Sequence, residues 1–176
     1  KSESENQKSV VRVLYDDTGI YIRATLYDNE PDKIAKQLKE RDVINNDDFL
    51  GVFINGYNDK QQSYEFIVTA AGVQFDAKAT NDNGEDDTWN GIWYSAVKIT
   101  DKGWNVEMKI PYFELRFPKD NVQQWGINFF RNIQRQRKKL SWNHIDNTKG
   151  NITLYDGILN GIEKVKTPIR LSFTPY

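Results

Sequence analysis

The sequence predicts an all-β protein, folded as an antiparallel β-sandwich or a small barrel. Apolar and polar side chains alternate with a period of two along most of the chain, which is typical of strands with one buried face. Turn-forming residues interrupt this alternation roughly every eight to twelve residues. Helical periodicity is confined to two short connectors, at 31–38 and 111–115, which leaves no crossover helices for a parallel sheet.

Each expected strand follows from the alternation. Val11 and Val13 alternate with their neighbours before a turn at 16–19, and Ile20 and Ile22 do so after it, which predicts a hairpin. A second hairpin is expected to turn at 101–103. The expected strands are 11–15, 20–27, 49–56, 63–69, 72–80, 93–100, 104–111 and 125–135, with shorter ones near 141, at 152–158 and at 169–173.

Composition excludes several kinds of site. The 176 residues include one His and no Cys, so disulfides, thiol nucleophiles, Cys-based zinc sites and histidine metal clusters are excluded. The 24 Lys and Arg nearly balance the 25 Asp and Glu, which argues against general nucleic-acid binding. The apolar runs are too short for a membrane-spanning helix. We expect a flexible segment at 1–9, one sandwich domain at 10–166 and a C-terminal strand or linker at 167–176.

A dense acidic run at 81–93, NDNGEDDTWNGIW, is the first candidate site. Its hard oxygen ligands suit calcium, which takes about six to eight oxygens in loose geometry. A second acidic cluster precedes the strand at 49–56 and is a further source of ligands. The candidate ligands are Asp82, Asp86, Asp87, Asp47 and Asp48. The spacing does not match an EF-hand, and a solvated acidic loop with turn-capping residues is the alternative.

Aromatic side chains form the second candidate site. An indole presented at a loop can stack on the apolar face of a sugar ring, while amide, carboxylate and basic groups bind its hydroxyls. Trp89 lies in a polar loop beside Trp93 and is expected to be exposed. Trp104 and Trp125 alternate with core residues and are expected to pack inside. The alternative is that most of these rings belong to the core.

The stretch 131–139, RNIQRQRKK, is the one basic block. On a strand its arginines share a face and could meet sugar hydroxyls, carboxylated sugars or phosphates. A solvated or edge-protecting strand is the alternative, except that Phe129 and Phe130 draw Arg131 toward the fold. No acid and base pair for glycoside hydrolysis stands out, and spacing suggests no partner for His144, so no catalysis is predicted.

The order of the motifs resembles a known family. VRVLYDDTGIYIRATLYDNEPDKI is followed by YEFIVTAAGVQFDA, DDTWNGIWYSAVKITDKGWNVEMKIPYFELRFP and WGINFFRNIQR. Over residues 10–176 this order is similar to the family 9 carbohydrate-binding module-like domain. More narrowly, it resembles the version that precedes an outer-membrane β-barrel of uncharacterised function in bacterial proteins. The closing TPIRLSFTPY resembles the segment that leads into that barrel.

The resemblance implies an immunoglobulin-like β-sandwich with one or two short connecting helices, a structural calcium ion and noncatalytic binding of a xylan- or cellulose-like glycan. Trp89, Asn90 and Trp93 are the positions that could clamp the sugar, with Arg131 and Gln74 as polar partners. It also implies the soluble part of an outer-membrane protein in a bacterial cell envelope, covalently continuous with the barrel. The alternative is a structural or protein-interaction module, a plug or docking domain, that has lost sugar binding.

Overall fold

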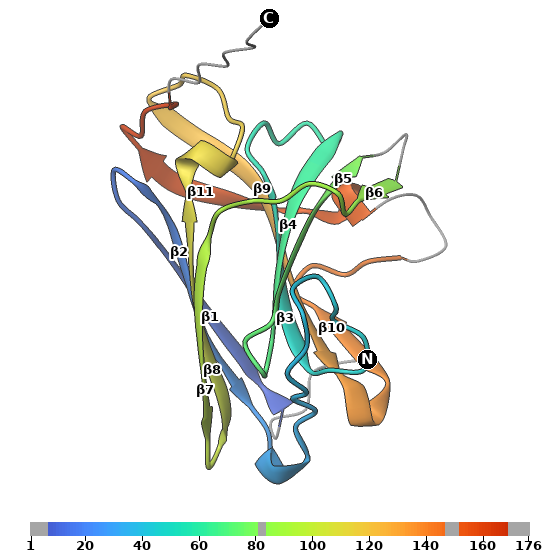
Figure 1. Ribbon diagram of the computed structural model, residues 1–176. Helices are drawn as coiled ribbons and strands as arrows, with labels where there is room; N and C mark the ends of the chain where they lie inside the picture. The colour runs from blue at the N-terminus through green and yellow to red at the C-terminus, as the bar shows by residue number, and fades with distance from the viewer. Residues whose placement is uncertain (1–6, 81–83, 147–151, 169–176) are drawn as a thin grey trace, which may run out of the picture.

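Two antiparallel sheets pack face to face in the computed structural model, which describes residues 7–80, 84–146 and 152–168 (Figure 1). This confirms the predicted all-β sandwich. The connecting helices shrink to single 3-10 turns, η2 (Pro31–Lys33), η3 (Tyr112–Glu114), η4 (Gln134–Gln136) and η5 (Ile152–Tyr155). No helix in the described ranges has the length and apolarity to cross a membrane.

The smaller sheet has the strand order β1-β2-β8-β7. These strands are β1 (Ser9–Tyr15), β2 (Gly19–Tyr27), β8 (Gly103–Pro111) and β7 (Tyr94–Thr100). In the central pair, Ile20, Ile22 and Ala24 lie opposite Ile110, Met108 and Val106, and all six are buried. The period-two pattern therefore places one apolar row of each strand against the other sheet.

The larger sheet has the order β10-β9-β3-β4-β5-β6. These strands are β10 (Lys138–Ser141), β9 (Val122–Ile133), β3 (Phe49–Asn55), β4 (Gln62–Thr69), β5 (Gln74–Thr80) and β6 (Gly84–Asp86). The long β9 pairs with β10 near its C-terminal end and with β11 (Gly157–Glu163) near its N-terminal end. β6 was expected to be a loop, because its three residues carry no apolar alternation.

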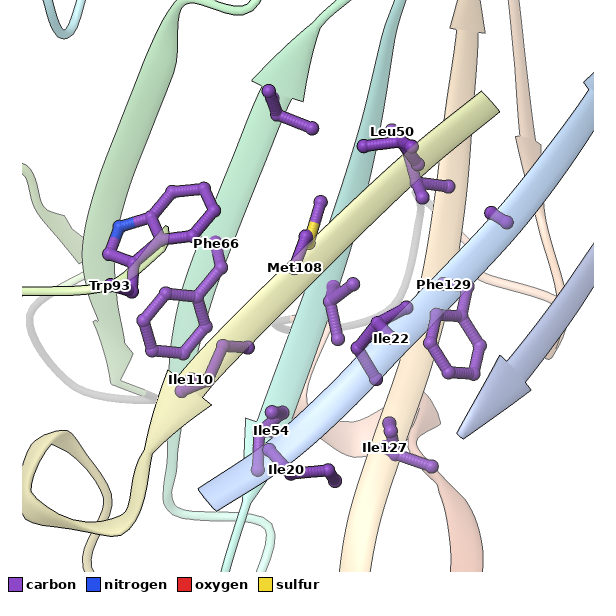
Figure 2. Packing of buried hydrophobic residues seen from close by; sticks show 14 of the residues in the cluster. Ile20, Ile22, Leu50, Ile54, Phe66, Trp93, Met108, Ile110, Ile127 and Phe129 are labelled. Carbon is purple, nitrogen blue, oxygen red and sulfur yellow. The ribbon is translucent and has the colours of Figure 1, made fainter. Parts of the chain in front are cut away.

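The core lies between the two sheets. Figure 2 shows β2 and β8 crossing in front of the larger sheet, with Leu50, Ile54 and Phe66 behind them. Trp104 and Trp125 are fully buried, which confirms their expected place in the core. Gln7 is also buried, so residues 7–9 belong to the fold rather than to a flexible segment. The strand expected at 169–173 lies outside the described residues.

A second apolar layer covers the outer face of the larger sheet, the face turned away from the smaller sheet. Every residue of β3 is buried, which means that this strand is covered on both faces. A separate cluster formed by Phe49, Ile67, Phe75 and Ala77 lies on this side, with Ile44 and Phe130 packed against it. The turn η5 contacts β5 and lies beside it in Figure 1, so residues 152–155 cover part of this face.

Candidate functional site

Trp93 is a core residue, which overturns the prediction that it offers an exposed ring to a sugar. Its side chain is 4% exposed, and its ring centroid lies 5.5 Å from that of Phe66. The indole Nε1–H donates to Asp76 Oδ2 at 2.8 Å. Figure 2 shows the indole beside Phe66 at one end of the core. A ring fixed in this way cannot stack on a ligand.

Trp89 is half-buried, and protein groups occupy much of its surface. Its ring makes edge contacts with Tyr64 and Phe66, at centroid distances of 5.1 and 5.8 Å. The Lys78 ammonium lies 5.2 Å from the centroid, as a cation–π contact. The backbone of Gly91 is so close that a Cβ there would lie 2.9 Å from the ring. Trp89 therefore packs down the edge of the sandwich and is a poor stacking platform.

Asp76 fastens the acidic loop to β5. Its buried carboxylate accepts from Trp93, from the Gly91 backbone N–H at 3.1 Å and from Arg41. Gln74 supports the same junction, because its Oε1 accepts from Arg41 at 2.7 Å and its Nε2 donates to Ser95 Oγ at 3.0 Å. The structure thus brings Gln74 and Trp93 together as predicted, but their hydrogen bonds join β5 to neighbouring segments of the chain.

The other two predicted ligand-binding residues lie in different surroundings. Asn90 is exposed in the loop beside Trp89. Arg131 lies between the sheets, 2% exposed, and donates to the backbone carbonyls of Gln7 and Tyr27 at 3.0 and 2.9 Å. A glycan cannot reach this guanidinium, so its assignment to the sugar site is wrong. These hydrogen bonds join β9 to Gln7, just before β1, and to the end of β2.

Among the described residues, no group of three or more His or acidic side chains is placed to hold a metal ion. The Asp47 carboxylate accepts from Lys39 and from the Gln37 backbone N–H at 2.9 Å. Asp48 accepts from the Gln134 backbone N–H at 2.8 Å, and burial raises its pKa. These two carboxylates therefore anchor loops.

The acidic loop itself is also engaged locally. Asp86 accepts from the hydroxyl and backbone N–H of Thr88 at 2.6 and 3.1 Å, and these bonds lower the pKa of Asp86. Asp87 is exposed. Asp82 lies outside the described residues. Calcium in this loop stays a prediction.

The outer face of the larger sheet carries a pocket of about 740 Å³ that sequence reasoning missed. We call it the outer-face pocket. Its floor is apolar and includes the rings of Phe49, Phe53 and Phe75, with the half-buried ring of Phe130 beside them. Phe53 and Phe130 stack at a centroid distance of 4.6 Å. The polar lining residues are Glu65, Glu85, Lys139 and Ser141.

Glu65 is the unusual residue of this floor. Its side chain points to the outer face, since its cross-strand neighbours Phe53 and Ala77 line or underlie that face. It is 4% exposed and makes no hydrogen bond or ion pair with any described residue. Burial, reinforced by the nearby Glu85, raises the pKa of Glu65 to about 8. The group is therefore a neutral acid at pH 7, able to donate to a ligand oxygen or to ionise beside a cation.

The described residues between β10 and β11, at 142–146 and 152–156, form one wall of the outer-face pocket. Asn128 of β9 fixes it by donating to the backbone carbonyls of Asn143 and Tyr155 at 3.2 and 3.1 Å. Asp156 accepts from Ser63 Oγ at 3.2 Å, and burial raises its pKa to about 7. The wall contributes Ile145 and Ile152. A signal for this face exists in the sequence, because FLGVFIN is a continuous apolar run where a one-sided strand would alternate.

The comparisons with known proteins agree on the architecture. A crystal structure of a candidate carbohydrate-binding protein from Bacteroides uniformis is similar with a TM-score of 0.71 at 14% identity, covering 88% of this chain and 78% of that one. A family 9 carbohydrate-binding module from Caldicellulosiruptor kristjanssonii in complex with cellotriose gives a TM-score of 0.60 at 15% identity, over 99% of this chain and 83% of that one.

The same module in complex with glucose gives a TM-score of 0.55 at 17% identity, over 99% and 84% of the two chains. At these identities the likeness shows the fold. No curated protein matches the sequence. The family model described as carbohydrate family 9 binding domain-like matches residues 1–157. The chain therefore belongs to the carbohydrate family 9 binding domain-like family.

Proposed function

We propose that this protein is a noncatalytic carbohydrate-binding domain that takes its ligand in the outer-face pocket. The observation that carries the proposal is the pocket itself, about 740 Å³ with an apolar floor and a few polar groups. Ligand sites in proteins commonly combine these two features. Family membership supplies the ligand class, and the related modules crystallised with cellotriose and glucose support a glucose-based glycan.

Two features of the pocket support saccharide binding. The ring of Phe130 is half-buried beside the opening and offers an apolar surface to the C–H face of a sugar. Glu85, Lys139 and Ser141 lie around it and can bind hydroxyl groups. With one ring and a few hydrogen bonds, we expect a dissociation constant of roughly micromolar to millimolar size.

Binding without hydrolysis is the reading we favour. Glycoside hydrolysis needs one acid that donates a proton and one ionised carboxylate, about 5 to 10 Å apart. Burial raises the pKa of Glu65 to about 8, so this acid is not the ionised member of such a pair, and the sequence singles out no acid and base pair. Incubation with xylo- and cello-oligosaccharides should therefore release no new reducing ends.

Isothermal titration of cello- and xylo-oligosaccharides tests the binding site. Phe130→Leu keeps the apolar volume but removes the ring, so it should weaken binding severalfold. Trp89→Phe is the matched control, because this tryptophan packs on Tyr64 and Phe66 rather than in the pocket. If Trp89→Phe abolishes binding and Phe130→Leu does not, the glycan site is at the acidic loop and the outer-face pocket is refuted.

The setting of the domain is carried over from the sequence resemblance. We infer that it is the soluble part of a bacterial outer-membrane protein and is continuous with a C-terminal β-barrel. The expected outcome is that the full-length protein, tracked by an antibody to this domain, fractionates with the outer membrane. Recovery in the soluble fraction would contradict the inference without affecting sugar binding.

A partner-docking module is the second candidate, and one observation favours it. A groove of about 1210 Å³ with a mixed apolar and polar lining runs between β1 and the strands β9, β10 and β11, and its lining includes the exposed side chains of Trp142 and Ile158. The chain lacks Cys, so Ile158→Cys provides a single labelling site. Docking predicts that a maleimide labels this site in the isolated domain and much more slowly in the full-length protein.

A further inference from the structure

The outer-face pocket contains a buried carboxyl group for which the described residues supply no partner. Three other buried acids form ion pairs: Asp76 pairs with Arg41, Asp47 with Lys39 and Asp28 with Arg135. The buried Asp48 has no ion pair, but it accepts from the Gln134 backbone N–H. Glu65 is buried to a similar extent but has no hydrogen bond or ion pair within the part of the chain that the structure describes. Burying such a group without a partner is costly, so a partner from outside the chain is a natural explanation.

The immediate surroundings of Glu65 suit a cation. Phe53 lies directly opposite on β3, and its ring stacks on Phe130. Phe49 adds an edge contact to Phe130 at a centroid distance of 5.7 Å. The faces of aromatic rings attract ammonium groups, which is why aromatic cages recognise them. On the other side of Glu65, the neighbour on β5 is Ala77, whose small side chain leaves room above the carboxyl.

The charged groups around the pocket also favour a cationic ligand. Glu85 of β6 and Lys139 of β10 line it, and Asp156 lies in the segment that forms its wall, bonded to Ser63. With Lys60 close enough to Asp156 to act on its charge, three carboxyl groups face two ammonium groups in this region. A positively charged ligand group would offset the excess, whereas an anionic ligand would add to it.

We propose that the pocket binds a ligand that carries a primary ammonium group on an apolar-faced ring, the free-amine form of an amino sugar, with the ammonium placed on Glu65. This inference rests on the proposed glycan binding and names the class of sugar. The ammonium donates charge-assisted hydrogen bonds to the carboxylate, while the sugar ring lies against Phe130.

Proton release accompanies this binding mode. Free Glu65 holds a proton at pH 7, because burial raises its pKa to about 8, and pairing with an ammonium group requires the ionised form. Glu65 therefore loses its proton to the buffer when the amine binds. A neutral sugar gives no such release, since the protonated acid can donate directly to a hydroxyl oxygen.

The test compares three trisaccharides by isothermal titration at pH 7: the free-amine glucosamine trimer, its N-acetylated form and cellotriose. We expect the free-amine trimer to bind at least about tenfold more tightly than the other two. Titration at pH 6, where both Glu65 and the amine start protonated, in two buffers of different ionisation enthalpy should show release of about one proton for the amine alone. This measurement on the unaltered protein needs no variant.

Variants then assign the preference to Glu65. Glu65→Gln keeps the side-chain shape and should reduce the ratio of amine to cellotriose affinity to about one, while Glu107→Gln, an exposed glutamate on the smaller sheet, should leave it unchanged. Equal affinity for amine and cellotriose in the unaltered protein would overturn the inference and leave glycan binding standing. Failure of all three sugars to bind would overturn both. A lysine peptide that binds as tightly as the free-amine trimer would overturn the amino-sugar assignment.

Discussion

Phe53 of β3 lies directly across from Glu65 of β4 on the outer face of the larger sheet, so an aromatic ring borders a buried carboxyl group. Both residues come from strands whose opposite faces fill the core between the sheets. The pair therefore stands on a rigid floor, and its exposure depends on the segments that cross that face. The burial of Glu65 therefore affects both the stability of the domain and the chemistry of its pocket.

Stability should fall as the pH rises from about 4.5 to about 8. Glu65 has a pKa of about 8 in the folded protein against 4.5 as a model group, so the folded state binds its proton more tightly. The contribution of Glu65 to the unfolding free energy is therefore largest below pH 4.5. It decreases by roughly 3 to 5 kcal/mol as the pH passes 8.

Asp156 acts in the same direction, because burial raises its pKa from 3.8 to about 7. Urea unfolding at pH 5, 7 and 8.5 measures the slope. Glu65→Gln should reduce the slope to the part that Asp156 contributes, and the exposed Glu107→Gln serves as the control. A parent protein that is equally stable at pH 5 and 8.5 would contradict this account of Glu65.

Arg41→Met should destabilise the domain by about 2 to 4 kcal/mol. It leaves the buried Asp76 carboxylate without its cation, although Trp93 and Gly91 still donate to it. Arg23→Met removes the exposed ion pair with Glu107 and should cost less than about 1 kcal/mol. Chemical denaturation of the two variants gives the comparison, and equal effects would mean that Asp76 does not depend on Arg41.

Gly51→Ala should damage the outer-face pocket more than the core. A Cβ at Gly51 would lie 2.5 Å from the Phe130 ring, so the ring must turn aside. We expect a loss of ligand affinity of about threefold or more, together with about 1 to 3 kcal/mol of destabilisation from overpacking. Ala96→Ser adds one atom at an exposed position on β7 and should change neither quantity. Unchanged binding in Gly51→Ala would show that Phe130 does not contact the ligand.

The calcium prediction is tested by thermal melts with EDTA and with added calcium. If the loop at 81–93 binds the ion, EDTA lowers the melting temperature and calcium restores it, because the ion binds the folded state. Asp86→Asn with Asp87→Asn should then abolish the response. Asp47→Asn should retain it, since Lys39 and Gln37 already occupy that carboxylate. An EDTA-insensitive melt would remove calcium from the protein and leave the fold untouched.

The class of fold and most of the strands follow from periodicity in the sequence. Alternation at period two identifies the buried face of a strand wherever the other face meets solvent, as in β2 and β8. It also placed Trp104 and Trp125 in the core, because both flank alternating apolar residues. The family resemblance in the motif order was confirmed over residues 1–157.

Which polar and aromatic side chains remain accessible to a ligand depends on tertiary contacts. Arg131 looks like a surface cation in the sequence, yet its acceptors lie 124 and 104 residues away, at Gln7 and Tyr27. Trp93 is held by Asp76, and Glu65 is buried by segments that cross the far side of its sheet. The spacing of neighbouring residues fixes which face a side chain takes. Whether another segment covers that face depends on contacts between distant parts of the chain, which local periodicity does not encode.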